Sequence, residues 1–302
     1  MENIWQQLSK EIEDKVGAAG ESIVAVDGRS GHTSSGILWR PDYVLTAAHT
    51  IRAEGGIEVL AASGKSSRAR LAGRAPACDL ALLKLDSPIE KAPAVFAETA
   101  SLKVGALVAA VARTRRGNIV ASAGVLSGVM GEWRTGRARI DQFIRPDLTL
   151  YAGFSGGALI DSSGKMLGMM TSGLVHRKAI AIPASTLKRI GEEILTKGHT
   201  VSPYIGVVMQ AVSIPEKIQK LSGVSSSAGL LIMHVEAASP AETAGVLLGD
   251  ILVTLDGKGF EAVEDLQDVL LRRGVHQAVP AVLIRGGNKL ELTITIGERP
   301  VR

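Results

Sequence analysis

The segment from Glu21 to Ile182 alternates short aliphatic runs with turn-forming residues. Typical runs are Ser22–Val26, Gly56–Leu60 and Leu107–Val111, and Gly, Pro, Asn and Asp recur between runs of this kind. Short strands at such close spacing favour an all-β barrel or sandwich over alternating βα units. Aromatic residues make up only 3% of the chain, so its cores must be built from Val, Ile, Leu and Ala. This segment is therefore predicted to fold as a β domain.

One stretch of this domain surrounds a serine with glycines, in the order Gly153-Phe154-Ser155-Gly156-Gly157. Glycine destabilises regular structure and is kept where the chain needs a positive φ or a close approach. A loop of this kind lifts the Ser155 hydroxyl into a cleft. It also points the amides of Gly153 and Ser155 at one spot, as an oxyanion hole requires. Taken alone, the stretch is equally compatible with a plain turn between two strands.

A histidine and an aspartate precede this serine in matching local sequence. His49 follows the strand-like run Tyr43–Ala48, and Asp79 opens the apolar run Leu80–Leu85. Singly, these residues could be a core histidine and a strand-end cap. Together with Ser155 they predict a triad of nucleophile, general base and orienting acid.

These three segments resemble the active-site segments of trypsin-like serine proteases. Ser34–Leu38 and Ala179–Pro183 resemble specifically the HtrA (DegP/DegS) branch, and the resemblance covers about residues 20–298. It implies a mainly β protein with a chymotrypsin-like double β-barrel and the triad between the barrels. It also implies trimeric assembly, activity on unfolded or damaged proteins, and a hairpin over residues 118–131.

By the same resemblance, a few residues after the nucleophile frame the primary specificity pocket. None of these residues is charged, so we predict a preference for a small or medium aliphatic residue before the scissile bond. The residues are Thr171, Ser172, Gly173, Ile180 and Ile182.

The nucleophile loop departs from the family pattern at two places. Phe154 stands where HtrA proteins usually have asparagine, and Tyr151-Ala152 replaces the usual Asn-Pro. The phenyl ring either pins the loop by burial or holds it in a collapsed state until a ligand arrives.

A second domain follows a helix that begins at Ala184 and stops at Gly198. Tyr204-Ile205-Gly206-Val207 resembles the carboxylate-binding loop and edge strand of PDZ domains, which bind a peptide as an added strand. Further elements support this interpretation: a capping box at Ser239–Glu242, a helix over residues 263–271 and a hairpin around residues 286–288. An α+β PDZ domain is predicted, with an aliphatic preference set by Ile205, Val207, Leu266 and Leu270.

The first residues carry an apolar stripe, formed by Ile4, Leu8, Ile12 and Val16 at helical spacing. The helix packs either on its own domain or, by the resemblance, on a second subunit. We expect an N-terminal helical segment over residues 1–20, a protease domain over 21–198 and a PDZ domain over 199–302.

Composition excludes several other classes of protein. A net charge of +4 is too small for a nucleic-acid footprint. The lone Cys78 excludes an internal disulfide and is expected to be a buried structural thiol. The histidines form no metal-ligand pair and no phosphate loop is present, so neither a metal, ATP nor any other cofactor is implied. Two arginine groups are expected to be solvated loop charges, with an acidic or anionic partner as the alternative; they are Arg113, Arg115, Arg116 and Arg134, Arg137, Arg139.

The sequence contains no run of 18 apolar residues, and its N-terminus lacks the features of a secretion signal. A cytoplasmic location is expected if Met1 is the native start, and a periplasmic or extracytoplasmic one if the chain has been trimmed.

These features predict an ATP-independent serine endopeptidase of the HtrA type that degrades unfolded or damaged proteins, with the PDZ domain recognising C-terminal or extended peptides. PDZ occupancy is expected to change the activity of the cleft. The principal alternative is a proteolytically silent chaperone or scaffold, which Phe154 favours. A weaker one is an enzyme that acts on esters or small amides.

Overall fold

The computed structural model describes residues 3–28, 33–135, 138–175 and 178–299. Arg137 lies outside these ranges, so the expectation for it does too. The chain divides into two compact units, Met1–Thr200 and Val201–Arg302. The division falls two residues after the boundary expected from the sequence.

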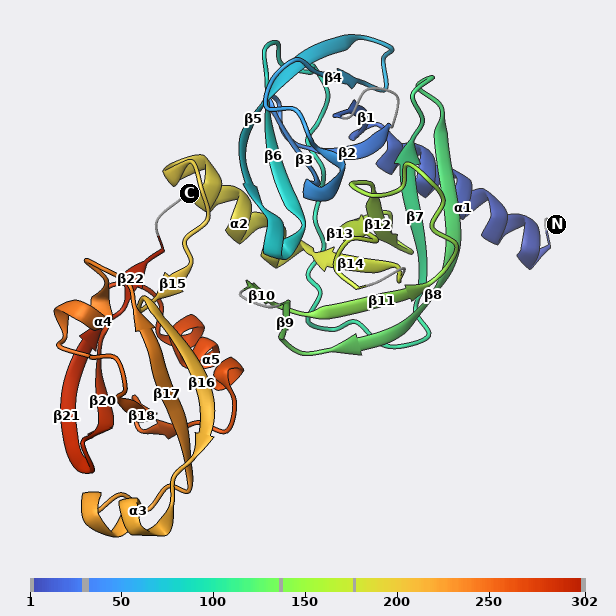
Figure 1. Ribbon diagram of the computed structural model, residues 1–302. Coiled ribbons are helices and arrows are strands. Elements are labelled where there is room, and N and C mark those ends of the chain that lie inside the picture. The colour runs from blue at the N-terminus through green and yellow to red at the C-terminus, as the bar shows by residue number, and fades with distance from the viewer. Residues whose placement is uncertain (1–2, 29–32, 136–137, 176–177, 300–302) are drawn as a thin grey trace. The chain divides into compact units, whose positions relative to one another are not determined.

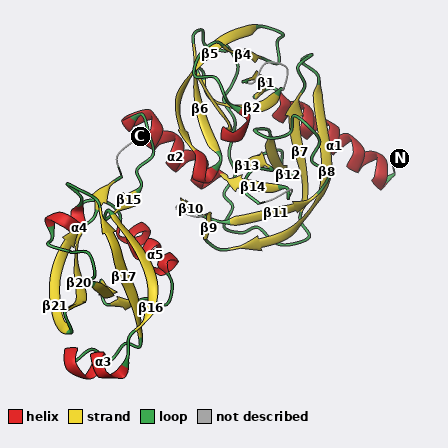
Figure 2. Ribbon diagram, viewed as in Figure 1, coloured by secondary structure: helices red, strands yellow, loops and turns green. Residues whose placement is uncertain are grey.

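The first unit contains two closed antiparallel β-barrels of six strands each. Figure 1 shows both barrels, and Figure 2 shows how little helix accompanies them. The predicted chymotrypsin-like double β-barrel is confirmed. In order around the first barrel the strands are β1 (Ile23–Asp27), β2 (Ser34–Arg40), β3 (Tyr43–Ala47), β6 (Leu80–Leu85), β5 (Ser66–Ala75) and β4 (Ile57–Leu60). In order around the second they are β11 (Phe143–Asp147), β14 (Ile180–Pro183), β13 (Met166–Thr171), β12 (Ala158–Asp161), β7 (Leu107–Arg113) and β8 (Ile119–Met130).

Short elements connect the barrel strands. A 3₁₀ turn, η1 (Ala48–Thr50), follows β3, and a second, η2 (Pro76–Cys78), precedes β6. A small two-stranded sheet pairs β9 (Trp133–Thr135) with β10 (Ala138–Ile140). The two 3₁₀ turns matter most here, since they carry His49 and precede Asp79.

The prediction of a hairpin over residues 118–131 is wrong. These residues form one long strand, β8, which pairs with β7 on one side and β11 on the other. The turn lies earlier, where Gly117 has a φ of +87°. Gly124 serves a different purpose, because a Cβ there would lie 2.0 Å from the carbonyl oxygen of Asp147 in the neighbouring strand. This glycine permits a close approach within the sheet rather than a reversal of the chain.

Two helices complete the first unit. Helix α1 (Ile4–Gly20) begins at Asn3, whose side chain forms a reciprocal capping box with Gln6. Its C-terminal part packs on the barrels, whereas the apolar side chains at its N-terminus are exposed. Helix α2 (Ala184–Lys197) ends at the left-handed Gly198, as the sequence predicts.

Arg113 contradicts the expectation of a solvated loop charge. Its side chain is buried, and its guanidinium donates three hydrogen bonds to backbone carbonyls: to Gly20 at 2.6 Å, Ile23 at 2.6 Å and Gly117 at 2.5 Å. Burial lowers the pKa of the Arg113 guanidinium, while the Glu21 carboxylate opposes that shift. The guanidinium thereby joins the end of α1 to the start of β8.

The second unit is built on one antiparallel sheet, in the order β16-β17-β18-β20-β21. Its strands are β16 (Val207–Ser213), β17 (Ala228–Val235), β18 (Ile251–Leu255), β20 (Ala278–Arg285) and β21 (Asn288–Thr295), with β19 (Lys258–Gly259) paired to β18 and β15 (Pro203–Tyr204) paired to β22 (Gly297–Glu298). Its helices are α3 (Glu216–Ser222), α4 (Pro240–Thr243) and α5 (Val263–Arg273).

The predicted capping box of α4 forms only in part. The Ser239 hydroxyl accepts from the amide of Glu242 at 3.2 Å, but the Glu242 carboxylate accepts from the amide of Ala238 at 2.6 Å instead of that of Ser239. Ala238 has a φ of +55°, and this conformation brings its amide within reach of the carboxylate.

Candidate active site

The carboxylate of Asp79 is the most strongly held group in the site. Asp79 follows η2 in a left-handed conformation, with a φ of 52°, and only 4% of it is exposed. One carboxylate oxygen accepts from the backbone amide of His49 at 2.8 Å, and the other lies 2.7 Å from Nδ1 of that histidine. The Thr171 hydroxyl also donates to this second oxygen. Three hydrogen bonds thus fix the carboxylate against the imidazole.

His49 is oriented by this contact. Its Nδ1 donates to the carboxylate, which leaves Nε2 as the basic nitrogen. Its side chain is 38% exposed, whereas that of Asp79 is buried beneath it. A base with one buried, paired nitrogen and one accessible nitrogen is what proton transfer to and from a substrate requires.

Ser155 lies in a loop that is hydrogen-bonded on every side. The amide of Gly156 donates to Met170 at 2.8 Å, and that of Gly157 donates to the carbonyl of Phe154 at 2.9 Å. Gly156 has a φ of +87°, and a Cβ there would lie 1.9 Å from the carbonyl oxygen of Ser35. Only glycine fits at this position, as the motif predicts.

Phe154 anchors the loop by burial. Only 2% of it is exposed, and it belongs to the hydrophobic core of the second barrel. Its ring centroid lies 5.9 Å from that of Tyr151. The sequence left open whether the Phe154 ring pins the loop by burial or holds it in a collapsed state. The buried ring in the structure supports the first interpretation.

Both predicted oxyanion donors are free to donate a hydrogen bond to a ligand. The amides of Gly153 and Ser155 donate no hydrogen bond to another residue in the described part of the chain. Gly153 has a φ of +93°, which glycine adopts without strain.

The nucleophile's own hydroxyl has an unexpected neighbour. Ser155 Oγ lies 3.3 Å from the hydroxyl of Ser172, and no hydrogen bond joins it to His49. Hydrogen bonds between a nucleophile and its base are often long until substrate is bound.

The five residues expected to frame a specificity pocket have three different surroundings. Thr171 and Gly173 support the triad: the Thr171 hydroxyl is committed to Asp79, and a Cβ on Gly173 would lie 2.7 Å from His49 Nδ1. Ile180 and Ile182 are fully buried in β14. Ser172 is exposed, and its hydroxyl lies 3.3 Å from that of Ser155. The pocket and its aliphatic preference stay predictions. No sequence signal assigned Thr171 its contact with Asp79, because 92 residues separate them.

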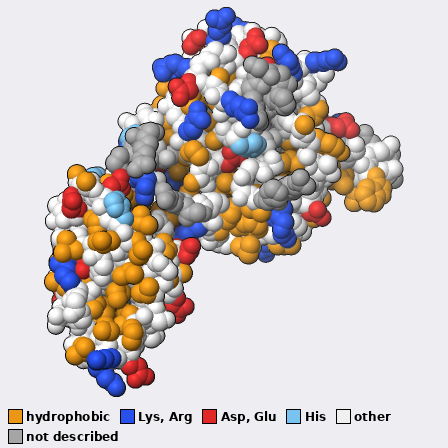
Figure 3. Space-filling model, viewed as in Figure 1, with side chains coloured by type: hydrophobic (Ala, Val, Ile, Leu, Met, Phe, Trp, Pro, Cys, Tyr) orange, Lys and Arg blue, Asp and Glu red, His pale blue; other side chains and the backbone are white. Residues whose placement is uncertain are grey.

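The predicted carboxylate loop of the second unit leads into an edge strand. Gly206 has a φ of +80°, and β16, which begins at Val207, pairs within the sheet only with β17. Three of the four residues predicted to set the peptide preference, Ile205, Leu266 and Leu270, are buried in the core of this unit. Figure 3 shows hydrophobic side chains gathered over the face that carries β16 and β17. Val208 of β16 and Met233 of β17 are among the exposed large hydrophobic residues.

Other chemistry receives no support from the described residues. Within them, no group of three His, Cys, Asp or Glu side chains gathers as a metal ion would require. Burial raises the pKa of the Cys78 thiol to about 11, so the thiol is neutral and unreactive at physiological pH. Among the helices that the structure describes, none has the length and hydropathy of a membrane span.

Comparisons with known proteins place both units. The family model of the trypsin-like peptidase domain matches residues 34–169, and that of the PDZ domain matches residues 203–296. The chain is 28% identical over 267 residues to the serine protease Do-like HtrA of Lactobacillus helveticus, and 27% identical over 293 residues to that of Bacillus subtilis. These matches cover 84% and 90% of this chain, and the chain spans 65% of the length of each relative.

Solved structures show the same fold over nearly the whole chain. The crystal structure of the serine endoprotease from Yersinia pestis superimposes with a TM-score of 0.73 at 26% identity, covering 95% of this chain and 98% of that one. A structure of the HtrA-type protease AlgW with a decapeptide gives a TM-score of 0.73 at 24% identity, covering 96% of this chain and 99% of that one.

Proposed function

This chain is an HtrA-like trypsin-fold protein with one C-terminal PDZ domain, and from that premise we propose that it is an ATP-independent serine endopeptidase acting on unfolded or damaged proteins. The observation that carries the proposal is the His49–Asp79 pair, held by Thr171. Beside it lies a serine loop whose two predicted oxyanion amides donate no hydrogen bond to any described residue.

Each residue has one part in the proposed reaction. Ser155 Oγ attacks the scissile carbonyl, and His49 Nε2 takes the hydroxyl proton and then passes it to the leaving amine. Asp79 stabilises the imidazolium, and the amides of Gly153 and Ser155 stabilise the oxyanion. The resulting acyl-enzyme is hydrolysed by water through the same steps. None of these steps requires ATP.

The PDZ domain supplies the proposed substrate recognition. An extended or C-terminal segment would add to the free edge of β16, with its carboxylate at the loop of Tyr204–Val207. We also propose that occupancy of this groove changes the rate in the cleft, as a coupling between the two domains.

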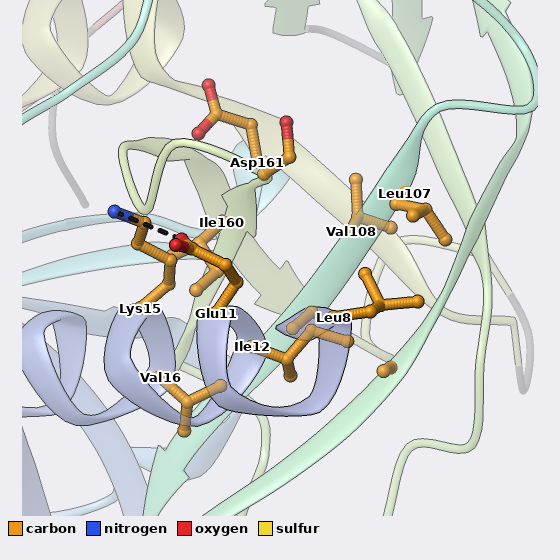
Figure 4. A pocket seen from close by; sticks show the side chains of 12 residues that line it. Leu8, Glu11, Ile12, Lys15, Val16, Leu107, Val108, Ile160 and Asp161 are labelled. Atoms are coloured by element: carbon orange, nitrogen blue, oxygen red, sulfur yellow. Dashed lines mark ion pairs between the residues drawn. The ribbon is translucent and has the colours of Figure 1, made fainter. Parts of the chain in front are cut away.

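Helix α1 supports a proposal of self-association, as a trimer or a multiple of it. Trp5 is 75% exposed on a helix whose apolar side chains continue into a hollow of about 270 Å³ between α1 and the second barrel. Figure 4 shows Leu8, Ile12 and Val16 facing this hollow from α1, opposite Leu107 and Val108 of β7. A second copy would cover this surface.

The proposal is tested by cleavage of an unfolded reporter protein without ATP, beside the Ser155→Ala variant. Removal of the nucleophile should lower turnover by roughly 10³- to 10⁶-fold. A hydrophobic C-terminal peptide, added to both reactions, reports on the PDZ domain.

A proteolytically silent, peptide-binding chaperone is the second candidate. The contact between the hydroxyls of Ser155 and Ser172 favours it, because that contact occupies the nucleophile without its base. If the wild type binds the reporter but cleaves it no faster than Ser155→Ala does, the result would support the chaperone and reject the protease.

A further inference from the structure

Ser35 is a fully buried serine of the first barrel that reaches the nucleophile loop of the second. It lies in β2, and none of its surface is exposed. Ser35 belongs to the segment Ser34–Leu38 that resembles the HtrA branch, and it has no part in the reaction proposed above.

Ser35 holds the loop through two carbonyls, one on each side of Phe154. Its hydroxyl donates to the carbonyl of Gly153 at 2.8 Å, and its backbone amide donates to the carbonyl of Ser155 at 3.0 Å. The hydroxyl oxygen in turn accepts from the amide of Arg113 at 3.0 Å. The Ser35 hydroxyl also lies 3.5 Å from the Arg113 carbonyl. Because the Gly153 oxygen is nearer, the hydroxyl proton is assigned to the hydrogen bond with Gly153.

These contacts complete the support of the oxyanion loop. The peptide unit between Gly153 and Phe154 is held at its oxygen by Ser35 and at its amide by Tyr151, 3.2 Å away. The next peptide unit is held through the Phe154 carbonyl by Gly157, and the one after it by Ser35 and Met170. Among the described residues, the hydroxyl of Ser35 makes the one hydrogen bond to a backbone atom of Gly153 itself, the residue that carries the first oxyanion donor.

We propose that Ser35 is a positioning residue for the oxyanion hole, whose hydroxyl fixes the orientation of the Gly153 backbone. This inference rests on the proposed protease function. Donors in an oxyanion hole accelerate reaction only if they are already aimed at the position of the developing charge. Without the Ser35 hydroxyl, the carbonyl of Gly153 loses its partner. The φ and ψ of this glycine are then less restrained, so its amide, which belongs to the preceding peptide unit, can turn away from the required geometry.

The test compares Ser35→Ala with Ser34→Ala in the full chain. Ser34 is the matched control, since it is a buried serine of the same strand whose hydroxyl contacts Val26 in the first barrel at 3.4 Å. For an aliphatic peptide substrate, Ser35→Ala should lower kcat by about 10- to 100-fold, because a displacement of about 1 Å can cost that much, and should leave KM nearly unchanged. Affinity for a peptide boronate, which forms a tetrahedral adduct, should fall by a similar factor. The shape of the pH–rate profile should not change, since Ser35 does not touch His49.

Two additions keep the outcomes distinct. Ser35→Cys keeps the shape of the side chain with a slightly larger atom and replaces the donor by a weak one, so it leaves no cavity and should lose activity even if Ser35→Ala fails to fold. Amide hydrogen exchange over residues 152–157 should be faster in both Ser35 variants than in Ser34→Ala, whether or not the protein cleaves peptides. If the wild type is inactive, the proposed protease function is rejected. The exchange measurement would still show whether Ser35 orders the loop. An active wild type with Ser35→Ala matching Ser34→Ala in kcat, boronate affinity and exchange would overturn this inference.

Discussion

Phe154 shows how a single residue can replace a family feature and keep the site intact. Its ring leaves the cleft and joins the core of the second barrel, so the loop that carries Ser155 is anchored by hydrophobic burial. An asparagine at this position would bring an amide into a site built from aliphatic side chains.

This contrast gives a prediction for two variants. Phe154→Asn should destabilise the protein by at least about 3 kcal/mol, since truncating a buried Phe costs about that much and the buried amide lacks a partner. Phe154→Leu should be tolerated far better, because it keeps most of the buried apolar volume. Thermal and urea unfolding of the full chain measure both, with the cleavage rate recorded in parallel. Equal stabilities for the two variants would show that the ring does not anchor the loop.

At this scale the sequence predicts the triad but not its supports. His49, Asp79 and Ser155 each stand in a local pattern that announces a role. The contacts of Thr171 with Asp79 and of Ser35 with Gly153 join residues 92 and 118 positions apart, and nothing local marks them. The prediction for Arg113 was wrong for the same reason, because two of its three carbonyl partners, Gly20 and Ile23, come from a segment about 90 residues away that meets Arg113 only in the folded protein.

Among the elements, α5 depends on an aspartate in its first turn. The Asp265 carboxylate accepts from the amides of Glu261 at 2.8 Å and Ala262 at 2.9 Å. These hydrogen bonds with Ala262 and Glu261 lower the pKa of Asp265 below its usual range. Ala262 at the N-terminus of the helix has no side-chain acceptor, so Asp265 takes over the capping function.

Replacement of this residue should give a pH-dependent loss of stability. Asp265→Ala is expected to cost about 1 kcal/mol at pH 7, as loss of a cap typically does. Since the folded pKa is depressed, the contribution of the charge is complete above the unfolded pKa of about 4 and disappears as the pH falls through the folded value. Urea unfolding at pH 7 and at pH 3 tests this, with Glu264→Ala in the same turn as the control. A difference that persists undiminished at pH 3 would contradict the assignment.

The elements themselves are predictable where periodicity and terminators agree. Helices α1, α2 and α5 lie at or close to their expected positions, as do the strands that precede His49 and follow Asp79. The error over residues 118–131 has a physical cause: Gly124 and Gly128 interrupt an aliphatic pattern as turn glycines do, but both lie within β8. Glycine is required both in a turn and where two strands approach closely, so the sequence looks the same in the two cases. Only the position of the partner strand distinguishes them.

For the molecule as a whole, α1 carries the testable consequence for assembly. The double variant Ile4→Ser with Trp5→Ser removes two strongly exposed apolar side chains without touching the capping contacts of Asn3 and Gln6. If these residues join subunits, the wild type should be a trimer or a multiple of it, and the double variant should be mainly monomeric.

Light scattering after size-exclusion chromatography measures the masses directly. Gln7→Ser, an exposed polar position on the same helix, is the control and should retain the wild-type mass. Identical masses for all three proteins would remove α1 from the interface.

The hydrogen bonds from β2 to the loop of Ser155 also bear on the order in which the first unit can assemble during synthesis. Ser35 leaves the ribosome well over a hundred residues before Ser155. Its hydrogen bonds to the loop of Ser155 therefore cannot form until that part of the second barrel has been synthesised. Contacts so distant in sequence form late, after both ends of the intervening chain have been ordered. A growing chain therefore carries His49 and Asp79 long before it carries an assembled cleft. If the protein is the proposed protease, its hydrogen-bonded nucleophile loop can form only after both barrels have been synthesised.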